Sequence, residues 1–166
     1  MPSTTEAPTH ECTCMALRQA ARHITQFYDL RLAPTGLRTT QFSILAKLQR
    51  LGPLTINALA RQLAIDRTTL GRTMLPLQRS RLITIMDGKR DRRSKELHLT
   101  QAGAERLRAA RKPWTEAQQH LAAAFGAERT LNLRNELHAL ASSDLGILPK
   151  VGKSQRKSAR AAHDRP

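Results

Sequence analysis

Apolar residues recur every three or four positions in the first third of the chain, which is the spacing of an amphipathic helix. The pattern predicts a first helix that ends at the turn residues Pro34-Thr35-Gly36. A second predicted helix runs from about Thr39 to Arg50 and stops at Gly52-Pro53. The apolar positions are Leu17, Ala20, Ala21, Ile24, Phe27 and Tyr28 in the first helix, and Phe42, Leu45 and Leu48 in the second.

Two shorter helical patterns follow in quick succession. Thr55 can cap the first and Asp66 can cap the second, with the break Ala64-Ile65-Asp66 between them. Two short helices joined in this way are typical of a helix-turn-helix. Pro76 predicts that the second helix bends or ends early, because proline lacks an N–H and clashes with the preceding turn. The apolar positions are Leu59, Ala60 and Leu63, and then Leu70, Met74 and Leu77.

The pattern then changes to that of short strands. Residues 82–86 are rich in β-branched side chains and residues 96–99 alternate polar and apolar, so they predict a hairpin whose connecting segment is basic. After it, Thr100 can cap a long helix from about Gln101 to Phe125, and Gly126 ends that helix. A last helix extends to about Ala141, with Leu133, Leu137 and Leu140 as its apolar positions.

A helix-turn-helix followed at once by a basic hairpin is the arrangement of a winged helix, which places one helix in the major groove of DNA. The stretches IDRTTLGRTMLPLQRSRLI (65–83) and DGKRDRRSKELHLTQAG (87–103) resemble the recognition helix and the wing of the MarR family, in which an Asp-x-Arg wing runs into a Leu-Thr-x-x-Gly helix start. The resemblance covers roughly residues 12–142. It implies a mainly α-helical fold with a small β-hairpin wing. It also implies an intertwined homodimer through the first, fifth and sixth helices, and an effector that weakens operator binding.

These patterns predict five parts. They are a disordered N-terminal tail (1–11), a dimerisation helix (12–36), a winged helix-turn-helix lobe (37–100), C-terminal dimerisation helices (101–149) and a disordered basic tail (150–166). No run of about 18 apolar residues exists, and the N-terminus lacks a signal pattern. We therefore expect a soluble, cytoplasmic protein with no membrane partner.

Charge strengthens the expectation of a polyanionic partner. Lys and Arg total 28 against 13 acidic residues, a formal charge of +15, which causes self-repulsion unless a polyanion is bound. Residues 61–95 include ten basic residues and only three acidic ones. The five aromatic residues of the chain do not line up as a platform for stacking single-stranded bases, so double-stranded DNA is the expected partner.

The helix that Asp66 can cap supplies the candidate base-reading set. If its leucines face the core, the opposite side presents polar residues, of which Arg72 can donate two hydrogen bonds to guanine. The alternative is a merely solvated face. In the family pattern, the arginine two places after the wing aspartate enters the minor groove, which here is Arg93 after Asp91. The residues are Thr68, Thr69, Arg72 and Thr73 in the helix, and Lys89, Arg90 and Arg93 in the wing.

Two kinds of signal stay open. Cys14 and Tyr28 are similar to the arrangement in the organic-peroxide-sensing branch of the family, where the tyrosine of the partner chain holds the reactive thiolate. A second tyrosine expected four residues after the cysteine is Arg18 here, a cation that can still favour the thiolate. The alternative is a small, often aromatic, anionic ligand in a cleft beside the dimer helices, with His23, Tyr28 and Arg31 as polar contacts.

Other functions have less support. Cys12 and Cys14 are too close for an ordinary disulfide with each other, and the C-x-C spacing matches no common zinc signature, so we expect neither metal nor cofactor. The chain lacks G-x-G-x-x-G and G-x-S-x-G motifs, so an enzyme is not expected. A non-specific architectural DNA-binding protein is the main rival to a sequence-specific repressor that binds a pseudo-palindromic operator.

Overall fold

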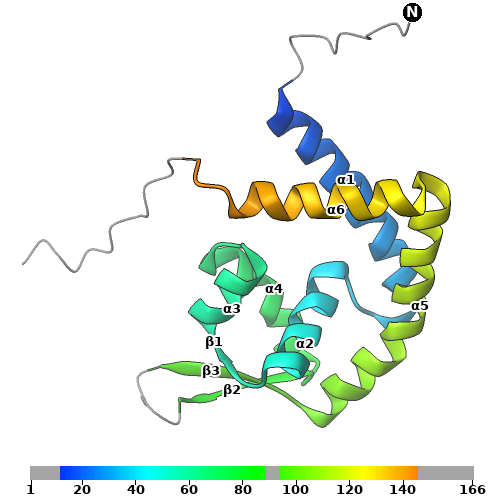
Figure 1. Cartoon of the computed structure of the whole chain (residues 1–166). Helices are drawn as coiled ribbons and strands as arrows, with labels where there is room; N and C mark the ends of the chain where they lie inside the picture. Colours follow the sequence, from blue (N-terminus) through cyan, green and yellow to red (C-terminus); the bar gives the residue numbers. More distant parts are fainter. Residues whose placement is uncertain (1–11, 89–93, 146–166) are drawn as a thin grey trace, which may run out of the picture. The chain divides into compact units, whose positions relative to one another are not determined.

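The computed structural model describes residues 12–88 and 94–145, and it divides the chain into two compact units, residues 1–121 and 122–166 (Figure 1). Among the residues that the structure describes, the first unit contains five shorter helical segments, three strands and most of the long helix α5, whereas the second contains the end of α5 and the helix α6. The elements are α1 (Thr13–Leu32), the 3-10 turn η1 (Ala33–Thr35), α2 (Thr39–Leu51), β1 (Leu54–Thr55), α3 (Ile56–Leu63), α4 (Arg67–Arg79), β2 (Ile83–Asp87), β3 (Lys95–Leu99), α5 (Gln101–Phe125) and α6 (Ala127–Ser142).

The core of the first unit lies among α2, α3, α4 and the sheet. The side chains of Leu59, Leu70 and Leu97 are fully buried, and each comes from a different element. On the α5 side, the Trp114 ring stacks on Phe42 with a centroid distance of 5.5 Å. The predicted apolar faces of four separate segments therefore meet in one core.

The sheet has three antiparallel strands in the order β1-β3-β2. β2 pairs with β3 in the register Ile85↔Leu97, which forms the predicted hairpin. β1 pairs with the other edge of β3 through Leu54↔Leu97. The strand β1 was not predicted from the sequence, because two residues are too few to show an alternating pattern.

The predicted caps fix both helices of the helix-turn-helix. The Thr55 hydroxyl accepts a hydrogen bond from the Ala58 amide at 3.1 Å, and the Asp66 carboxylate accepts one from the Thr69 amide at 2.9 Å. Between them, Ala64 has a positive φ of 51°, which lets the chain turn in so short a break.

Helix α4 does not end early at Pro76, which was one of the two outcomes expected from the sequence. It continues to Arg79, and the Pro76 carbonyl still accepts a hydrogen bond from the Ser80 amide at 3.0 Å. Met74 and Leu77 are buried on either side of the proline. Burial of these flanking side chains offsets the proline penalty, which is about 3 kcal/mol in an unsupported helix.

The start of α5 is joined to the chain segment that leads into β2. The Thr100 hydroxyl lies 2.7 Å from the Arg81 carbonyl and 3.0 Å from the Leu82 carbonyl, and it accepts a hydrogen bond from the Gly103 amide. A Cβ added at Gly103 would lie only 2.1 Å from the Leu82 carbonyl oxygen. Thr100 and Gly103 of the Leu-Thr-x-x-Gly pattern thus hold the hairpin and α5 in close contact.

The second unit is built around α6. The Thr130 hydroxyl donates to the Gly126 carbonyl at 2.8 Å, and the Arg129 guanidinium lies 4.3 Å from the centroid of the Phe125 ring. The leucines along α6 are exposed: Leu131, Leu133, Leu137 and Leu140. In neither unit does a described helix combine the length and apolar character needed to cross a membrane.

Candidate nucleic-acid interface

Helix α4 presents the polar face expected of a recognition helix. Its inner side is buried through Leu70, Met74 and Leu77, each at most 3% exposed. On the other side Thr68, Thr69 and Arg72 are exposed and Thr73 is half-buried. Among the described residues, the Arg72 guanidinium makes no hydrogen bond or ion pair, so all its donors are available to a ligand.

The threonines of α4 differ in what their hydroxyls do. The Thr69 hydroxyl donates to Asp66 Oδ2 at 2.5 Å, and the Thr73 hydroxyl donates to the Thr69 carbonyl at 2.9 Å. The hydrogen bonds from the Thr69 hydroxyl and then the Thr69 amide lower the pKa of Asp66 below its ordinary value of 3.8. Asp66 is therefore ionised at neutral pH, and it lies at the N-terminus of α4, where the helix dipole favours a negative charge.

The wing is described at its base only. Lys95 forms an ion pair with Asp87, and the Gly88 amide donates to the Ser94 carbonyl at 2.8 Å. Both contacts close the hairpin where β2 ends and β3 begins. The predicted wing residues Lys89, Arg90 and Arg93 lie outside the described residues.

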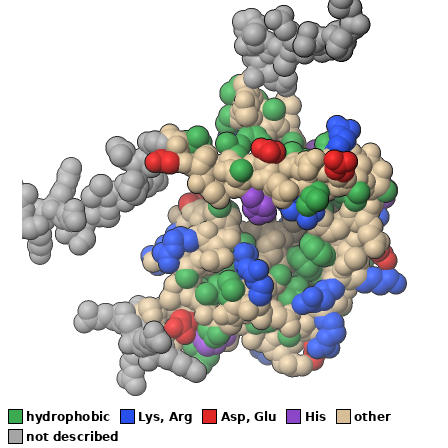
Figure 2. All heavy atoms as spheres, viewed as in Figure 1, with side chains coloured by type: hydrophobic (Ala, Val, Ile, Leu, Met, Phe, Trp, Pro, Cys, Tyr) green, Lys and Arg blue, Asp and Glu red, His purple; other side chains and the backbone are tan. Residues whose placement is uncertain are grey.

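Further exposed basic side chains lie on α4 and on the elements next to it in sequence. Four exposed arginines lie on α3, on α4 or directly after α4: Arg61, Arg67, Arg79 and Arg81. In the view of Figure 2, Lys and Arg side chains are also seen along α5. A surface with several exposed cations beside an amphipathic helix suits the phosphate backbone of a duplex.

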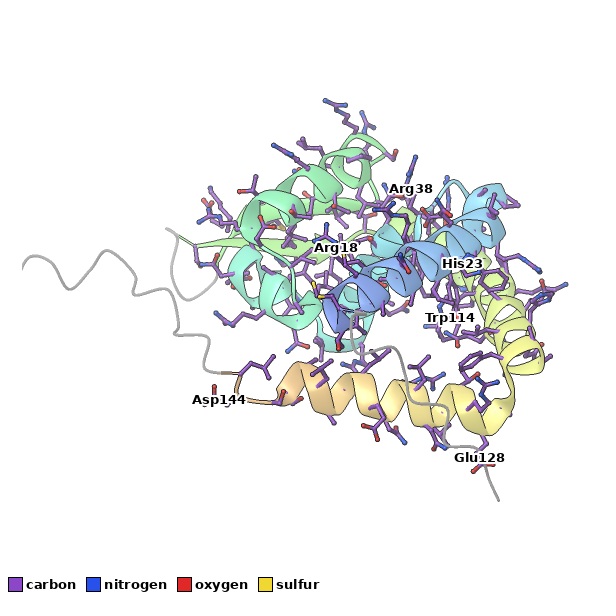
Figure 3. The ribbon with its side chains drawn as sticks, turned by 90° about the horizontal axis from the view of Figure 1, so that it is seen from above. Arg18, His23, Arg38, Trp114, Glu128 and Asp144 are labelled. Atoms are coloured by element: carbon purple, nitrogen blue, oxygen red, sulfur yellow. The ribbon has the colours of Figure 1, made fainter. Side chains whose placement is uncertain are left out.

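The cysteines lie where α1 begins. Cys12 is the N-cap of α1, and its carbonyl accepts hydrogen bonds from the amides of Met15 and Ala16. Both Cys12 and Cys14 are free and exposed, and Arg18 is exposed one turn further along (Figure 3). The sulfur atoms are thus accessible to a reagent from solution.

Tyr28 lies far from Cys14 within one chain. Both residues belong to α1, and fourteen residues of helix span about 21 Å. The Tyr28 side chain is buried, with its ring edge against Phe27 at 5.4 Å. A contact between Cys14 and Tyr28 therefore requires a second chain.

The predicted ligand residues of α1 differ in their exposure. His23 (Figure 3) and Arg31 are exposed, whereas Tyr28 is buried. The Arg31 guanidinium lies 5.2 Å from the centroid of the Phe27 ring, and its Nη2 lies 3.5 Å from His120 Nδ1. The structure thus joins Arg31 with Phe27 and His120. Sequence reasoning missed His120, because 89 residues separate it from Arg31.

A hollow of about 550 Å³ lies between the end of α1 and the start of α2. Asp29 on its wall accepts hydrogen bonds from the amide and the hydroxyl of Thr39, at 2.7 and 2.6 Å. Arg38 lies 4.0 Å from the same carboxylate (Figure 3). The predicted cleft residues are not part of this wall, which consists of Gln26, Asp29, Leu30, Ala33, Gly36, Leu37 and Arg38.

A capped helix-turn-helix, a hairpin wing and a long helix fixed to the wing define a winged-helix DNA-binding protein. The family model of the MarR family matches residues 37–95. The transcriptional regulator MosR of M. tuberculosis is 32% identical, with a TM-score of 0.69 over 82% of this chain and 100% of that one. A structure of MosR in complex with DNA is 33% identical, with a TM-score of 0.66 over 80% of this chain and 100% of that one.

A further similar structure is that of Bordetella bronchiseptica BpsR, a protein whose DNA binding is regulated by 6-hydroxynicotinic acid. At 18% identity, with a TM-score of 0.74 over 84% of this chain and 99% of that one, it supports the fold alone. No curated protein sequence matches the chain. With the family model and MosR together, the chain belongs to the MarR family of DNA-binding transcription regulators.

Proposed function

We propose that this protein is a homodimeric repressor that binds a pseudo-palindromic operator, with α4 in the major groove and the wing arginine Arg93 in the minor groove. The observation that carries the proposal is the exposed face of α4, where Arg72 has its donors unused while the opposite face is buried. The structure of MosR bound to DNA supports a duplex as the partner.

The homodimer is supported by the exposed leucines of α6. Leu131, Leu133, Leu137 and Leu140 are between 41% and 52% exposed in the single chain. Leucines at this density on one short helix favour burial against another apolar surface. Two copies of α4 would then meet two half-sites about one helical turn of DNA apart, roughly 34 Å.

Operator binding is tested with Arg72→Ala on DNA taken from upstream of the protein's own gene. Loss of a bidentate contact to guanine should reduce affinity by about 1–3 kcal/mol and relax discrimination at one base pair per half-site. Arg111→Ala, which removes an exposed arginine from α5, is the control for charge alone. Equal weakening on every sequence would make Arg72 a phosphate contact instead.

A comparison with random DNA separates the repressor from an architectural protein. A sequence-specific regulator should bind its operator at least about 10³ times more tightly than random duplex at the same salt concentration. A ratio near one would contradict the proposal.

For the signal, we propose a small aromatic anion held by Arg31, with Phe27 and His120 beside it. A guanidinium next to an aromatic ring offers a charge for a carboxylate and a face for a ring. Hydroxylated aromatic acids, including the 6-hydroxynicotinic acid that regulates BpsR, should release the operator from wild type. Arg31→Ala should need a higher concentration, whereas Arg22→Ala, which changes another exposed arginine of α1, should not.

The exposed cysteines favour a second signal, an organic hydroperoxide. The Cys14 thiolate would attack the O–O bond, which gives a sulfenic acid and releases an alcohol after proton transfer, and a thiol reductant reverses the change. Operator binding by wild type, Cys12→Ser and Cys14→Ser is compared before and after hydroperoxide. Release that requires Cys14 and reverses on reduction supports this signal, and wild-type binding that ignores hydroperoxide contradicts it.

A further inference from the structure

The hydroxyl protons of two threonines on the exposed face of α4 are already in use. The Thr69 hydroxyl donates to Asp66 Oδ2 at 2.5 Å, and the Thr73 hydroxyl donates to the Thr69 carbonyl at 2.9 Å. A hydroxyl has a single proton to donate. Neither residue therefore has a donor left for the acceptors of the major groove, which are guanine O6 and N7, adenine N7 and thymine O4.

The methyl groups of these threonines remain available. Both hydroxyls donate back to the helix itself, so each keeps only its acceptor lone pairs, and the methyl is the other group that the side chain can offer to a base. Thr69 is exposed and Thr73 is half-buried. They stand one helical turn apart, about 6 Å along the axis, so they form a short apolar strip on an otherwise polar face.

Thymine carries the only apolar group that unmodified base pairs present in the major groove, its C5-methyl. We propose that Thr69 and Thr73 select thymine through methyl contacts, and that 5-methylcytosine, which carries the same group, can take the place of thymine there. The inference rests on the proposed operator binding by α4. It assigns these two residues to apolar discrimination and leaves hydrogen-bond discrimination to Arg72 and Thr68.

Thr68 is the internal comparison. It is exposed, and among the described residues its hydroxyl makes no hydrogen bond, so it keeps a donor for a base. The three threonines thus separate into two that offer methyl groups and one that offers a free hydroxyl.

The DNA arm of the test removes single methyl groups. Each thymine of one half-site is replaced in turn by deoxyuridine, which differs only by the C5-methyl. At one or two positions we expect an affinity loss of about fourfold, which corresponds to one buried CH₂ group. At those positions cytosine should bind more weakly than 5-methylcytosine in the same base pair.

The protein arm exchanges methyl and hydroxyl groups. Thr73→Val keeps a methyl and removes the hydroxyl, whereas Thr73→Ser does the reverse; the same pair is made at Thr69 and at Thr68. At residues 69 and 73, valine should keep wild-type affinity and the sensitivity to deoxyuridine, and serine should lose both. At residue 68 the order should reverse. Thermal unfolding of each variant checks that the helix is intact. We expect it to be intact, because the backbone amide of residue 69 can still donate to Asp66 whatever its side chain.

Three results overturn the inference. The first is that deoxyuridine changes the affinity at no position although the protein still prefers its operator to random DNA. In that case only this inference fails, and the proposed function is retained. The second is serine variants that bind like wild type while valine variants fail, which means that the hydroxyls read the bases. If wild type does not distinguish operator from random DNA, the proposed function fails, and this inference fails with it.

Discussion

Helices α4 and α6 have similar patterns of apolar residues, but Leu70 and Leu77 of α4 are buried whereas the leucines of α6 are exposed. On α4, Leu70 and Leu77 are at most 1% exposed, whereas on α6 Leu133 is 46% and Leu137 is 41% exposed. The leucines of α4 find partners in α2, α3 and the sheet of the same chain. Those of α6 remain open in the single chain. The DNA-binding lobe thus has a core of its own, and α6 has a face suited to association.

The largest effect on stability should come from a substitution that leaves a cavity in the hydrophobic core of the DNA-binding lobe. Leu97 of β3 is fully buried at the centre of the sheet. Leu97→Ala should lower the free energy of unfolding by about 2–5 kcal/mol, because it removes transfer energy and leaves a cavity. Denaturant titration followed by circular dichroism measures it. A change below about 0.5 kcal/mol, the level of ordinary surface substitutions, would mean that the lobe does not depend on this core.

The next effect should come from α6 and appear in association. Leu133→Asp with Leu137→Asp should yield monomers and reduce operator affinity by about 100-fold, because two linked recognition helices gain that much over one. Analytical ultracentrifugation and operator binding measure the two changes. Asn132→Asp with Asn135→Asp adds the same charges to exposed polar positions of α6 and should change neither. If the leucine variants stay dimeric, the exposed leucines of α6 do not form the dimer interface, and the contrast drawn between α4 and α6 is wrong.

A smaller effect on stability is expected at Gly103, where the start of α5 packs against Leu82 and Leu99 of the DNA-binding lobe. The added Cβ of Gly103→Ala would lie 2.1 Å from the Leu82 carbonyl oxygen and 2.8 Å from Leu99 Cδ1. Relief of this overlap should cost about 1–3 kcal/mol of stability. Gly71→Ala in α4 is the matched control, since nothing lies within 4 Å of its Cβ, and it should stabilise the free protein by up to about 1 kcal/mol. Equal effects of the two variants would contradict the packing argument.

The smallest effect concerns the pH dependence of the α4 cap. Hydrogen bonds from Thr69 lower the pKa of Asp66 in the folded protein. The stabilisation is therefore complete above the ordinary pKa of 3.8 and is lost as the pH falls through the lower folded value. Asp66→Ala should lower the melting temperature at pH 7, and the difference from wild type should shrink towards pH 2. The difference in melting temperature between Asp66→Asn and Asp66→Ala, neither of which titrates at this position, should show no such trend.

Much of the fold followed from local patterns. The predicted long helix from Gln101 to Phe125 has those bounds in the structure, and Thr55 and Asp66 cap as expected. The two hairpin strands, β2 and β3, lie within one residue of their predicted positions. These features depend on neighbours three or four residues apart, which the sequence displays. The continuation of α4 through Pro76 was not decided by the sequence, because burial of the side chains around it determines whether the helix survives.

The sequence by itself determined the helix-turn-helix, the wing and the polar face of α4, since the period of apolar residues fixes which side of a helix is buried. The tertiary structure decided what the side chains on those faces can do. It placed His120 beside Arg31 and buried Tyr28, because residues distant in the chain meet only after the helices pack. It also showed that the hydroxyls of Thr69 and Thr73 bond to the helix while that of Thr68 stays free. Three identical side chains look alike in sequence, and only their rotamers and local acceptors distinguish the groups they can offer to DNA.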